Sequence, residues 1–526
     1  MKERVYLYDS TLRDGGQTST INFSASDKKK IAIELDRIGI DYIEGGWPRA
    51  NQTDDEFFAD LPTLNNSKFT AFGMTNRHSV PAYEDKSLNK LIASNVESVC
   101  IVGKSWDFHL KNALNITEKQ NLSMISDSIS HIRQSGKEAI FDAEHFFDGY
   151  KSNPEFSLKC LESAYKSGAR WVVLCDTNGG TLPYEIYDII LEVKKIIPHI
   201  NLGIHCHNDG GVAVANSIAA VKAGVRQVQG TLNGLGERCG NADLISLIPN
   251  LMLKMGFDVG IKAENLKNLC HTSYFLDDLL NRPRDNFAPF VGKFAFAHKG
   301  GLHVSAINKN SKSYEHIEPD LVGNKRRIMI SDQAGRSNVI SKIKEIGLEV
   351  DNKNKIINDL VEEVKLLESQ GYAYDNADAS FEILVKKSLN IIPNYFQLKS
   401  FKVFDELKGV EDKNIISKAE IEIVIDNEVK KTSSYGEGPI NALDKALRLV
   451  LSEKYPILDK TSLNDYKVMI LNSSDGTKAK TRVEIRSTDQ NGSEWTTIGV
   501  SKNIVEASFK ALRDSINYKL SKDSIG

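Results

Sequence analysis

From the start of the chain to about residue 260, short apolar or β-branched runs alternate with segments whose apolar residues recur three and four positions apart. Runs of the first kind are typical of buried strands, and segments of the second kind are typical of helices with one buried face. The strand-like runs are Val5–Asp9, Tyr42–Glu44, Lys68–Phe72, Ser98–Val102, Glu138–Asp142, Trp171–Cys175, Asn201–Cys206 and Val228–Thr231. The helical segments include Lys28–Ile38, Leu88–Ala93, Leu158–Lys166, Glu185–Ile196 and Val214–Ala223. Eight strands alternating with helices over roughly 250 residues predict an α/β fold, a (β/α)8 TIM barrel, at residues 1–262.

A doubly wound parallel sheet is the alternative that this pattern leaves open. Such a sheet typically carries a glycine-rich G-x-G-x-x-G turn after its first strand. The residues that follow Asp9 contain no such motif. We therefore expect the barrel.

The middle of the chain, residues 263–394, has a different pattern. Helical runs at Leu266–Leu280, Val339–Ile346 and Ile356–Ser369 are separated by a stretch rich in proline and glycine, Arg282–Leu302. This arrangement predicts a linker region of small helices rather than a second barrel.

The last part of the chain, residues 395–526, contains an internal repeat. In each copy, two alternating strand segments lead past a glycine into a helix. The copies are Ala419–Ile425, Val429–Tyr435 and Pro439–Leu451, then Thr481–Arg486, Glu494–Val500 and Ile504–Leu520. The repeat predicts a duplicated α+β domain with a regulatory or dimerising role.

Composition narrows the class of protein. The hydrophobic fraction is 41% and the charged fraction 26%, which are values of a globular protein rather than a disordered chain. A net charge of −3 gives no electrostatic reason to expect nucleic acid or a membrane surface as partner. The N-terminal segment has no apolar core of a secretion signal, and the six cysteines form no C-x-x-C pair. We expect a cytoplasmic protein with free thiols.

Candidate chemistry gathers where the predicted strands end, which is the functional face of a barrel. His205 and His207 lie two positions apart at a strand end, so both imidazoles project to the same side. Asp14 supplies a carboxylate and Asn241 an amide oxygen, and this mixture of ligands suits a borderline divalent cation. The alternative is a pair of histidines with purely structural hydrogen bonds.

Two further residues fit a site of this kind. Arg13, beside Asp14, could stabilise an oxyanion or enolate, although a surface ion pair is the alternative. Thr177 could donate its hydroxyl to a substrate carboxylate, although Asp176 and Thr177 could instead cap a helix.

Longer motifs around these residues resemble a known family. Leu12–Gln17 followed by Lys28, the stretch Leu202–Ala215, and the loop Gly234–Asn241 are similar to the signatures of the α-isopropylmalate, homocitrate and citramalate synthases. The resemblance extends over essentially all 526 residues, and the duplicated tail resembles the regulatory domain of that family. Glu44–Pro48 and Ala295–His303 most resemble the citramalate synthase branch, which serves isoleucine biosynthesis.

The resemblance implies a Claisen condensation between acetyl-CoA and a 2-oxo acid, followed by hydrolysis of the thioester. It implies a divalent metal (Mg, Mn or Zn) with Asp14, His205 and His207 as ligands and Asn241 as a weaker fourth ligand. Arg13 would bind substrate and offset negative charge. Glu144 would order substrate or water, and Thr177 would bind the substrate carboxylate.

The resemblance also assigns a role in proton transfer to His303, with Tyr314 near it. Both belong to a region that reaches over the partner subunit in relatives, so it implies a homodimer, and the tail implies an amino-acid inhibitor. His298 is a similarly placed alternative to His303. Ser10 and Gly16 depart from the usual motif, and Asp142 occupies a position that varies with the substrate.

Three other functions remain open at this point. The protein could be an isopropylmalate or homocitrate synthase, which would act on a different 2-oxo acid. A hydroxymethylglutaryl-CoA lyase has the same barrel but lacks the duplicated tail. A non-catalytic binding protein on a barrel would not need His205 or Asp14.

Overall fold

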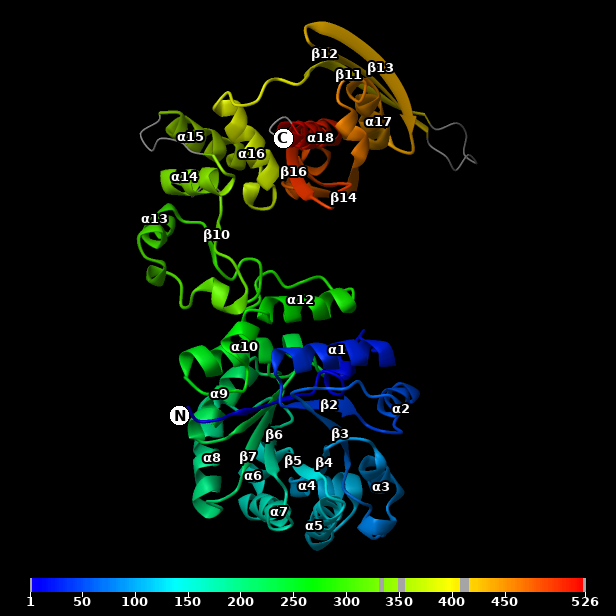
Figure 1. Ribbon diagram of the computed structural model, residues 1–526, viewed down its shortest axis with the longest axis vertical. Coiled ribbons are helices and arrows are strands. Elements are labelled where there is room, and N and C mark those ends of the chain that lie inside the picture. The colour runs from blue at the N-terminus through cyan, green and yellow to red at the C-terminus, as the bar shows by residue number, and fades with distance from the viewer. Residues whose placement is uncertain (1, 331–334, 349–354, 407–415, 524–526) are drawn as a thin grey trace. The chain divides into compact units, whose positions relative to one another are not determined.

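The computed structural model describes residues 2–330, 335–348, 355–406 and 416–523 (Figure 1). The chain forms two compact units. The first comprises Met1–Phe296 and Ile317–Lys325, and the second comprises Ala297–His316 and Arg326–Gly526.

The first unit is built on a closed barrel of eight parallel strands that pair in chain order, from β1 to β8. The ring closes where β1 pairs with β8, with Tyr6 opposite Gln227 and Asp9 opposite Gly230. The expected TIM barrel is therefore confirmed, and the doubly wound alternative is wrong because an open sheet has no such closure. The strands are β1 (Tyr6–Asp9), β2 (Tyr42–Gly46), β3 (Lys68–Met74), β4 (Ser98–Lys104), β5 (Glu138–Glu144), β6 (Trp171–Asp176), β7 (Leu202–Cys206) and β8 (Gln227–Gly230).

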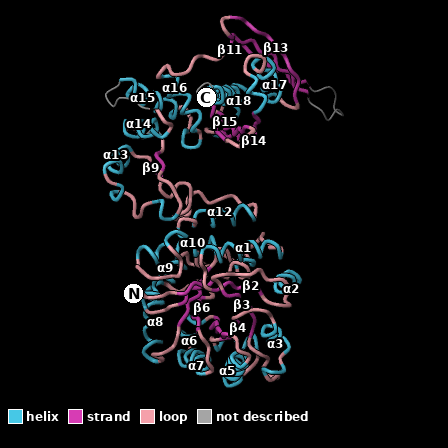
Figure 2. The backbone as a smooth tube through the Cα atoms, viewed as in Figure 1, coloured by secondary structure: helices cyan, strands magenta, loops and turns pink. Residues whose placement is uncertain are grey.

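Helices surround these strands, and Figure 2 shows the magenta strands enclosed by cyan helices. They are α1 (Ala25–Ile38), α2 (Gln52–Ala59), α3 (Lys86–Ala93), α4 (Asp107–His109), α5 (Glu118–Gln134), α6 (Phe146–Ser152), α7 (Pro154–Lys166), α8 (Pro183–Ile196), α9 (Ala213–Ala223), α10 (Leu244–Pro249), α11 (Ala263–Leu266) and α12 (Leu269–Leu279). The sequence pattern did not single out α5. Its buried face includes Asn121 and Ser128, and these polar residues interrupt the apolar period.

The inside of the barrel has an apolar part and a polar part. Tyr8, Tyr42, Ile140, Trp171 and Val173 belong to one buried cluster contributed by strands around the ring. Polar side chains are buried with them at the carboxyl ends of the strands, where an α/β barrel carries its functional groups. These are Glu44, Asp142, His205 and Gln229.

The second unit begins with small elements and helices. They are β9 (Ala297–His298), α13 (Gly301–Lys309), β10 (Arg327–Ile328), α14 (Arg336–Glu345), α15 (Lys355–Ser369) and α16 (Asp378–Ser388). The backbone N–H of Ile498, on β16 (Glu494–Ser501), donates to the hydroxyl of Ser380 on α16 at 3.0 Å, so α16 packs on the tail. The expected division of the chain at residues 262 and 394 stays a prediction.

The tail of the second unit contains two three-stranded antiparallel sheets, each followed by a helix. The elements are β11 (Gln397–Glu406), β12 (Ile416–Ile425), β13 (Glu428–Gly436) and α17 (Pro439–Leu451), then β14 (Thr461–Ile470), β15 (Thr481–Asp489), β16 (Glu494–Ser501) and α18 (Ile504–Asp523). Each copy thus has one strand more than the expected hairpin and helix. The additional strands β11 and β14 are edge strands, and each contains a register shift, between Leu398 and Ser400 and between Leu463 and Asp465, that interrupts its apolar alternation.

Among the helices in the described part of the chain, none has both the length and the apolar character needed to cross a bilayer.

Candidate active site

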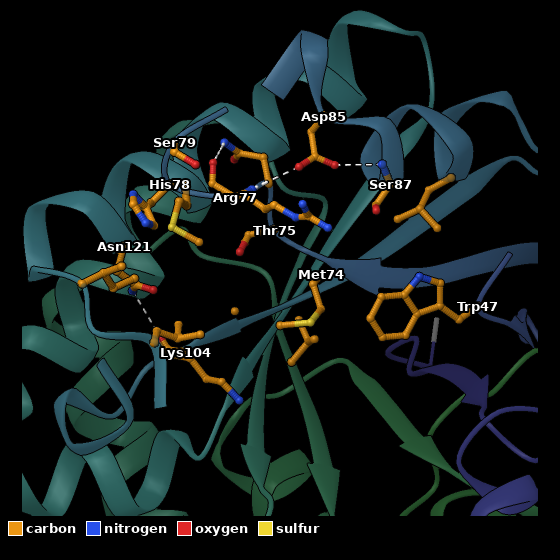
Figure 3. A pocket seen from close by; sticks show the side chains of 17 residues that line it. Trp47, Met74, Thr75, Arg77, His78, Ser79, Asp85, Ser87, Lys104 and Asn121 are labelled. Atoms are coloured by element: carbon orange, nitrogen blue, oxygen red, sulfur yellow. Dashed lines mark hydrogen bonds between the residues drawn. The ribbon is translucent and has the colours of Figure 1, made fainter. Parts of the chain in front are cut away.

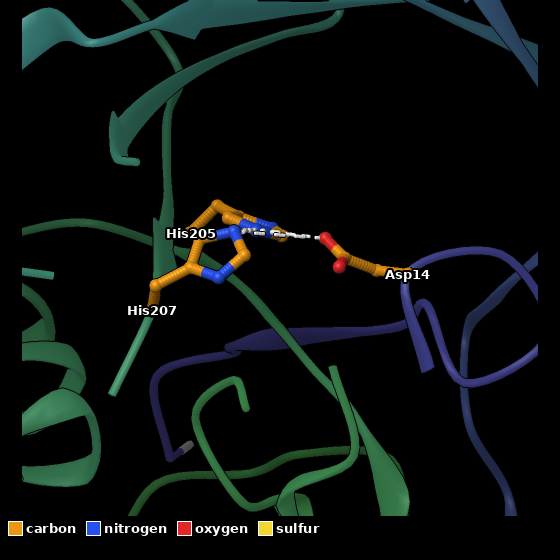
Figure 4. Close-up of side chains that lie close together, drawn as sticks. All are labelled: Asp14, His205 and His207. Carbon is orange, nitrogen blue, oxygen red and sulfur yellow. Dashed lines mark hydrogen bonds and ion pairs between the residues drawn. The ribbon is translucent and has the colours of Figure 1, made fainter. Parts of the chain in front are cut away.

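The loop after β1 and the end of β7 bring Asp14, His205 and His207 together. The Nε2 atoms of His205 and His207 lie 3.4 Å and 3.8 Å from Oδ2 of Asp14, and 3.4 Å from each other. Figure 4 shows the carboxylate directed at both imidazoles. All three side chains are buried, and among the described residues they form the one group of His, Cys, Asp or Glu spaced to hold a metal ion.

Several buried polar atoms at this place have no hydrogen-bond partner. They include Oδ1 of Asp14, Nδ1 of His207 and both amide atoms of Asn241. Asn241 lies beside the ligands because its backbone forms an isolated antiparallel bridge with His207. Leaving a buried polar atom unpaired costs roughly 1–3 kcal/mol, and a cation would satisfy the carboxylate and amide oxygens. The residues present therefore fit a divalent metal.

The charges of the three groups are strongly coupled. Burial disfavours ionisation of Asp14, but the charge of Arg13 and the adjacent His205 outweigh burial and hold the pKa of that carboxyl well below its usual range. Burial and the adjacent His205 lower the pKa of His207 to about 4. At neutral pH, Asp14 is thus a carboxylate and His207 a neutral imidazole, which are the forms that bind metals.

Arg13 is held against this group rather than in a surface ion pair. Its Nε donates to Oε2 of Glu44 at 2.7 Å and its Nη1 donates to Oδ2 of Asp14 at 3.1 Å. The guanidinium carbon lies 4.0 Å from the centre of the Phe72 ring. Glu44 is fully buried and also accepts from the hydroxyl of Tyr8 at 2.7 Å. No role for Glu44 was predicted from the sequence, although its place at a strand end was the available signal.

Glu144 and Thr177 lie at the ends of β5 and β6. The carboxylate of Glu144 forms an ion pair with Lys104, from the end of β4. The hydroxyl of Thr177 accepts from the backbone N–H of His145 at 2.9 Å. Thr177 does not cap α8, because that helix begins at Pro183.

His303 and Tyr314 belong to the second unit, and the structure brings them together. Their rings stack with centroids 4.1 Å apart and an interplanar angle of 28°. His298 is buried, and its Nε2 lies 3.2 Å from Oε1 of Glu315. Of the two histidines, His298 is thus committed to a hydrogen bond with Glu315, while His303 stacks on the exposed Tyr314.

A cavity of about 420 Å³ lies at the ends of β3 and β4 (Figure 3). Its apolar lining includes Met74, Val102 and Met124, and its cationic lining includes Arg77 and Lys104. The amide of Asn121 donates to the backbone oxygen of Lys104 at 2.9 Å and so fixes one wall. No sequence motif marks this cavity because its residues come from several loops and helices.

Comparison with known proteins gives a consistent picture over the whole chain. Residues 4–273 match the HMGL-like family, residues 290–371 the homocitrate synthase post-HMGL domain-like family, and residues 375–520 the LeuA allosteric (dimerisation) domain. The chain is 52% identical to an (R)-citramalate synthase of Aquifex aeolicus, with 99% of both chains covered. It is 47% identical to an (R)-citramalate synthase of Geobacter sulfurreducens, with 98% of both chains covered. It is 30% identical to a 2-isopropylmalate synthase of Methanocaldococcus jannaschii, with 99% of this chain and 95% of that protein covered.

Proposed function

The chain belongs to the family of 2-isopropylmalate, homocitrate and (R)-citramalate synthases, and we propose that it is an (R)-citramalate synthase of isoleucine biosynthesis. It is an acetyl-CoA-dependent acyltransferase that converts acetyl-CoA, pyruvate and water into (R)-citramalate and CoA. The observation that carries this proposal is identity over the full length, which is much higher with (R)-citramalate synthases than with 2-isopropylmalate synthases.

The metal site supports this chemistry. Asp14, His205 and His207 would hold the cation, with Asn241 as a fourth ligand. A bound divalent cation acts as a Lewis acid on the carbonyl of a 2-oxo acid. Two imidazoles and one carboxylate suit Zn²⁺ or Mn²⁺ better than Mg²⁺, which prefers oxygen ligands throughout.

The protein's own groups would act on the substrates as follows. Thr177 binds the carboxylate of pyruvate. As the carbon–carbon bond forms, negative charge grows on the former keto oxygen, and the fixed guanidinium of Arg13 offsets it. Glu144, held by Lys104, orders the water that hydrolyses the thioester and releases CoA.

His303 and Tyr314 would take part in removing a proton from the acetyl methyl group. Their stacked rings support a shared role. We infer that the protein is a homodimer in which the region carrying these residues completes the site of the other chain. The match to the LeuA allosteric (dimerisation) domain supports dimerisation and an amino-acid inhibitor bound by the tail. We propose that the protein works in the cytoplasm, with the rest of amino-acid synthesis.

The cavity at the ends of β3 and β4 would take part of acetyl-CoA. Its apolar lining suits the pantetheine arm, and Arg77 suits a phosphate. Arg77→Ala should raise the KM for acetyl-CoA and leave the KM for pyruvate unchanged. An equal rise in both KM values would contradict this placement.

The substrate is tested by initial rates of CoA release with four 2-oxo acids. We expect the highest kcat/KM with pyruvate, above 2-oxobutyrate, 3-methyl-2-oxobutanoate and 2-oxoglutarate. Preference for 3-methyl-2-oxobutanoate would make the protein an isopropylmalate synthase, and preference for 2-oxoglutarate a homocitrate synthase. Cleavage of hydroxymethylglutaryl-CoA without condensation would make it a lyase.

The shared site is tested by mixing two inactive variants, His303→Ala and Arg13→Lys. If His303 acts on the other chain's barrel, half of the dimers in an equilibrated mixture are mixed, and each mixed dimer regains one intact site of two. About a quarter of the wild-type activity should return. No recovery in mixtures that contain mixed dimers would place both residues in a site within one chain. Assays with single amino acids test for the inhibitor.

A further inference from the structure

A chain of hydrogen bonds runs from the metal-site histidine His205 into the barrel. Nδ1 of His205 lies 2.9 Å from Oε1 of Gln229, and Nε2 of Gln229 donates to Oδ1 of Asp142 at 3.1 Å. All three side chains are buried, with Gln229 fully excluded from solvent. His205 and Gln229 are register partners on β7 and β8, whereas Asp142 lies on β5, so the chain crosses the interior of the barrel.

The direction of each hydrogen bond in this chain follows from its end. A carboxylate only accepts hydrogen bonds, so the amide of Gln229 must turn its NH₂ group to Asp142. Its oxygen then faces His205 and can only accept, so the proton of the imidazole must sit on Nδ1. Burial raises the pKa of Asp142 to about 6, which still leaves an ionised carboxylate at neutral pH.

This hydrogen-bond chain also determines the state of Nε2, the other nitrogen of the His205 imidazole. In the neutral imidazole that binds a metal, a proton on Nδ1 leaves the lone pair on Nε2, the atom that faces Asp14 and His207. We propose that Asp142 and Gln229 are positioning residues that fix the tautomer of His205 and so prepare Nε2 as a metal ligand. This inference rests on the proposed function and on its metal site.

The second reading of Asp142 is that of a wall of the 2-oxo acid pocket. The contacts favour the positioning role. Asp142 is 3% exposed, and its carboxyl is engaged by Gln229 and by the thiol of Cys100. The two interpretations make different predictions. If Asp142 lines the substrate pocket, its replacement changes which 2-oxo acid is preferred. If Asp142 fixes the tautomer of His205, its replacement changes the affinity for the metal.

The test uses full-length protein and measures the Kd for Mn²⁺ by titration calorimetry, together with CoA release from pyruvate and acetyl-CoA. Gln229→Leu removes the acceptor of the imidazole proton. Asp142→Asn removes the group that orients the amide, because an asparagine can donate or accept. Each should weaken Mn²⁺ binding about 10–100-fold, as losing an outer partner of a ligating histidine typically does.

Exchanging the carboxylate of residue 142 and the amide of residue 229 gives a change in Mn²⁺ affinity that a loss of packing alone would not produce. Gln229→Glu should weaken Mn²⁺ binding, because it sets two carboxylates against each other. The double variant Asp142→Asn with Gln229→Glu keeps an acceptor for Nδ1 and restores a donor between the two side chains, so it should regain most of the affinity. Gln227→Leu is the matched control. It lies on the same strand, fully buried, and its side-chain amide has no hydrogen-bond partner, so its Kd should equal that of the wild type.

Three results would overturn the proposal. If the wild type binds Mn²⁺ and makes citramalate but the single variants bind Mn²⁺ equally well, the tautomer lock is wrong and the proposed function stands. A changed preference among 2-oxo acids at unchanged Kd would assign Asp142 to the substrate pocket. If the wild type binds no divalent metal at all, the metal site itself is wrong and this inference fails with it.

Discussion

Arg13 and Glu44 share a partly buried hydrogen bond of 2.7 Å between the guanidinium Nε and a carboxylate oxygen. A second bond, from Nη1 to Asp14, fixes the plane of the guanidinium beside the metal-binding carboxylate. Glu44 is itself tied to Tyr8, so the positive charge of Arg13 is oriented before any substrate arrives. Such preorganised charge is the principal means by which enzymes stabilise a developing oxyanion.

Arg13→Lys should therefore lower kcat by about 10²–10³, the usual loss when one oriented donor is removed from an oxyanion. A lysine ammonium cannot reach Glu44 and Asp14 in the same fork geometry. The measurement is steady-state CoA release, with circular dichroism to verify folding. Arg37→Lys is the control, since Arg37 pairs with Glu34 on a helix surface. Equal rates in the wild type and Arg13→Lys would remove Arg13 from the chemistry.

Removal of divalent metal should abolish condensation, and added Mn²⁺ or Zn²⁺ should restore it. Binding to the folded state alone at one hundred times Kd stabilises a protein by about 2.7 kcal/mol. For a barrel of this size that is a rise in Tm of roughly 5–10 °C. Thermal unfolding with and without metal measures it. Full turnover after exhaustive chelation, with an unchanged Tm, would show that Asp14, His205 and His207 hold no catalytic metal.

Asp9 makes stability depend on pH. Burial raises its pKa to about 7, although Thr11 donates two hydrogen bonds to it. The folded state thus holds a proton that the unfolded chain has lost above pH 4, so stability falls as pH rises from about 4 to 7. Asp9→Asn has no proton to lose and should be more stable than the wild type at pH 8, by roughly 1–3 kcal/mol.

Urea unfolding followed by tryptophan fluorescence at pH 5 and pH 8 measures this difference. The advantage of Asp9→Asn should be smaller at pH 5, where the wild-type carboxyl retains its proton in the folded state. An advantage that does not change between the two pH values would show that Asp9 does not titrate in this range.

The loop that carries Asn241 depends on Gly240. Gly240 has a φ of 88°, and a Cβ added to it would lie 2.0 Å from the backbone oxygen of Gly234. Gly240→Ala must therefore displace the loop, and we expect Mn²⁺ binding to weaken about tenfold or more with a loss of roughly 1–3 kcal/mol in stability. Gly180→Ala is the control, because no atom lies within 4 Å of its added Cβ. If both variants bind Mn²⁺ with the same Kd, Asn241 does not contribute to metal binding.

The barrel could be predicted from sequence because its strands and helices each obey one simple period. The same period could not find α5, where Asn121 and Ser128 occupy buried positions, or the exposed edge strands β11 and β14. The metal-ligand candidates stood out as motifs at strand ends.

The side chains behind the candidate ligands did not stand out. Gln229 and Asp142 are 87 residues apart and meet only inside the closed barrel. Glu44 and Arg13 are 31 residues apart and likewise come into contact only in the folded barrel. Hydrophobic periodicity and sequence motifs indicate burial and local chemistry. Which side chains meet inside the barrel depends instead on how the eight strands are arranged around it.

The pairing of β1 with β8 gives the candidate metal site a place at the seam of the barrel. Asp14 follows the first strand, whereas His205, His207 and Asn241 come from the last two strands and the loop beyond them. An ion bound there joins the segment synthesised first to the segments synthesised about 200 residues later. A bound ion would therefore stabilise the closed barrel by linking its first strand to its last two. The folding chain would bind the ion tightly only after β1 has paired with β8.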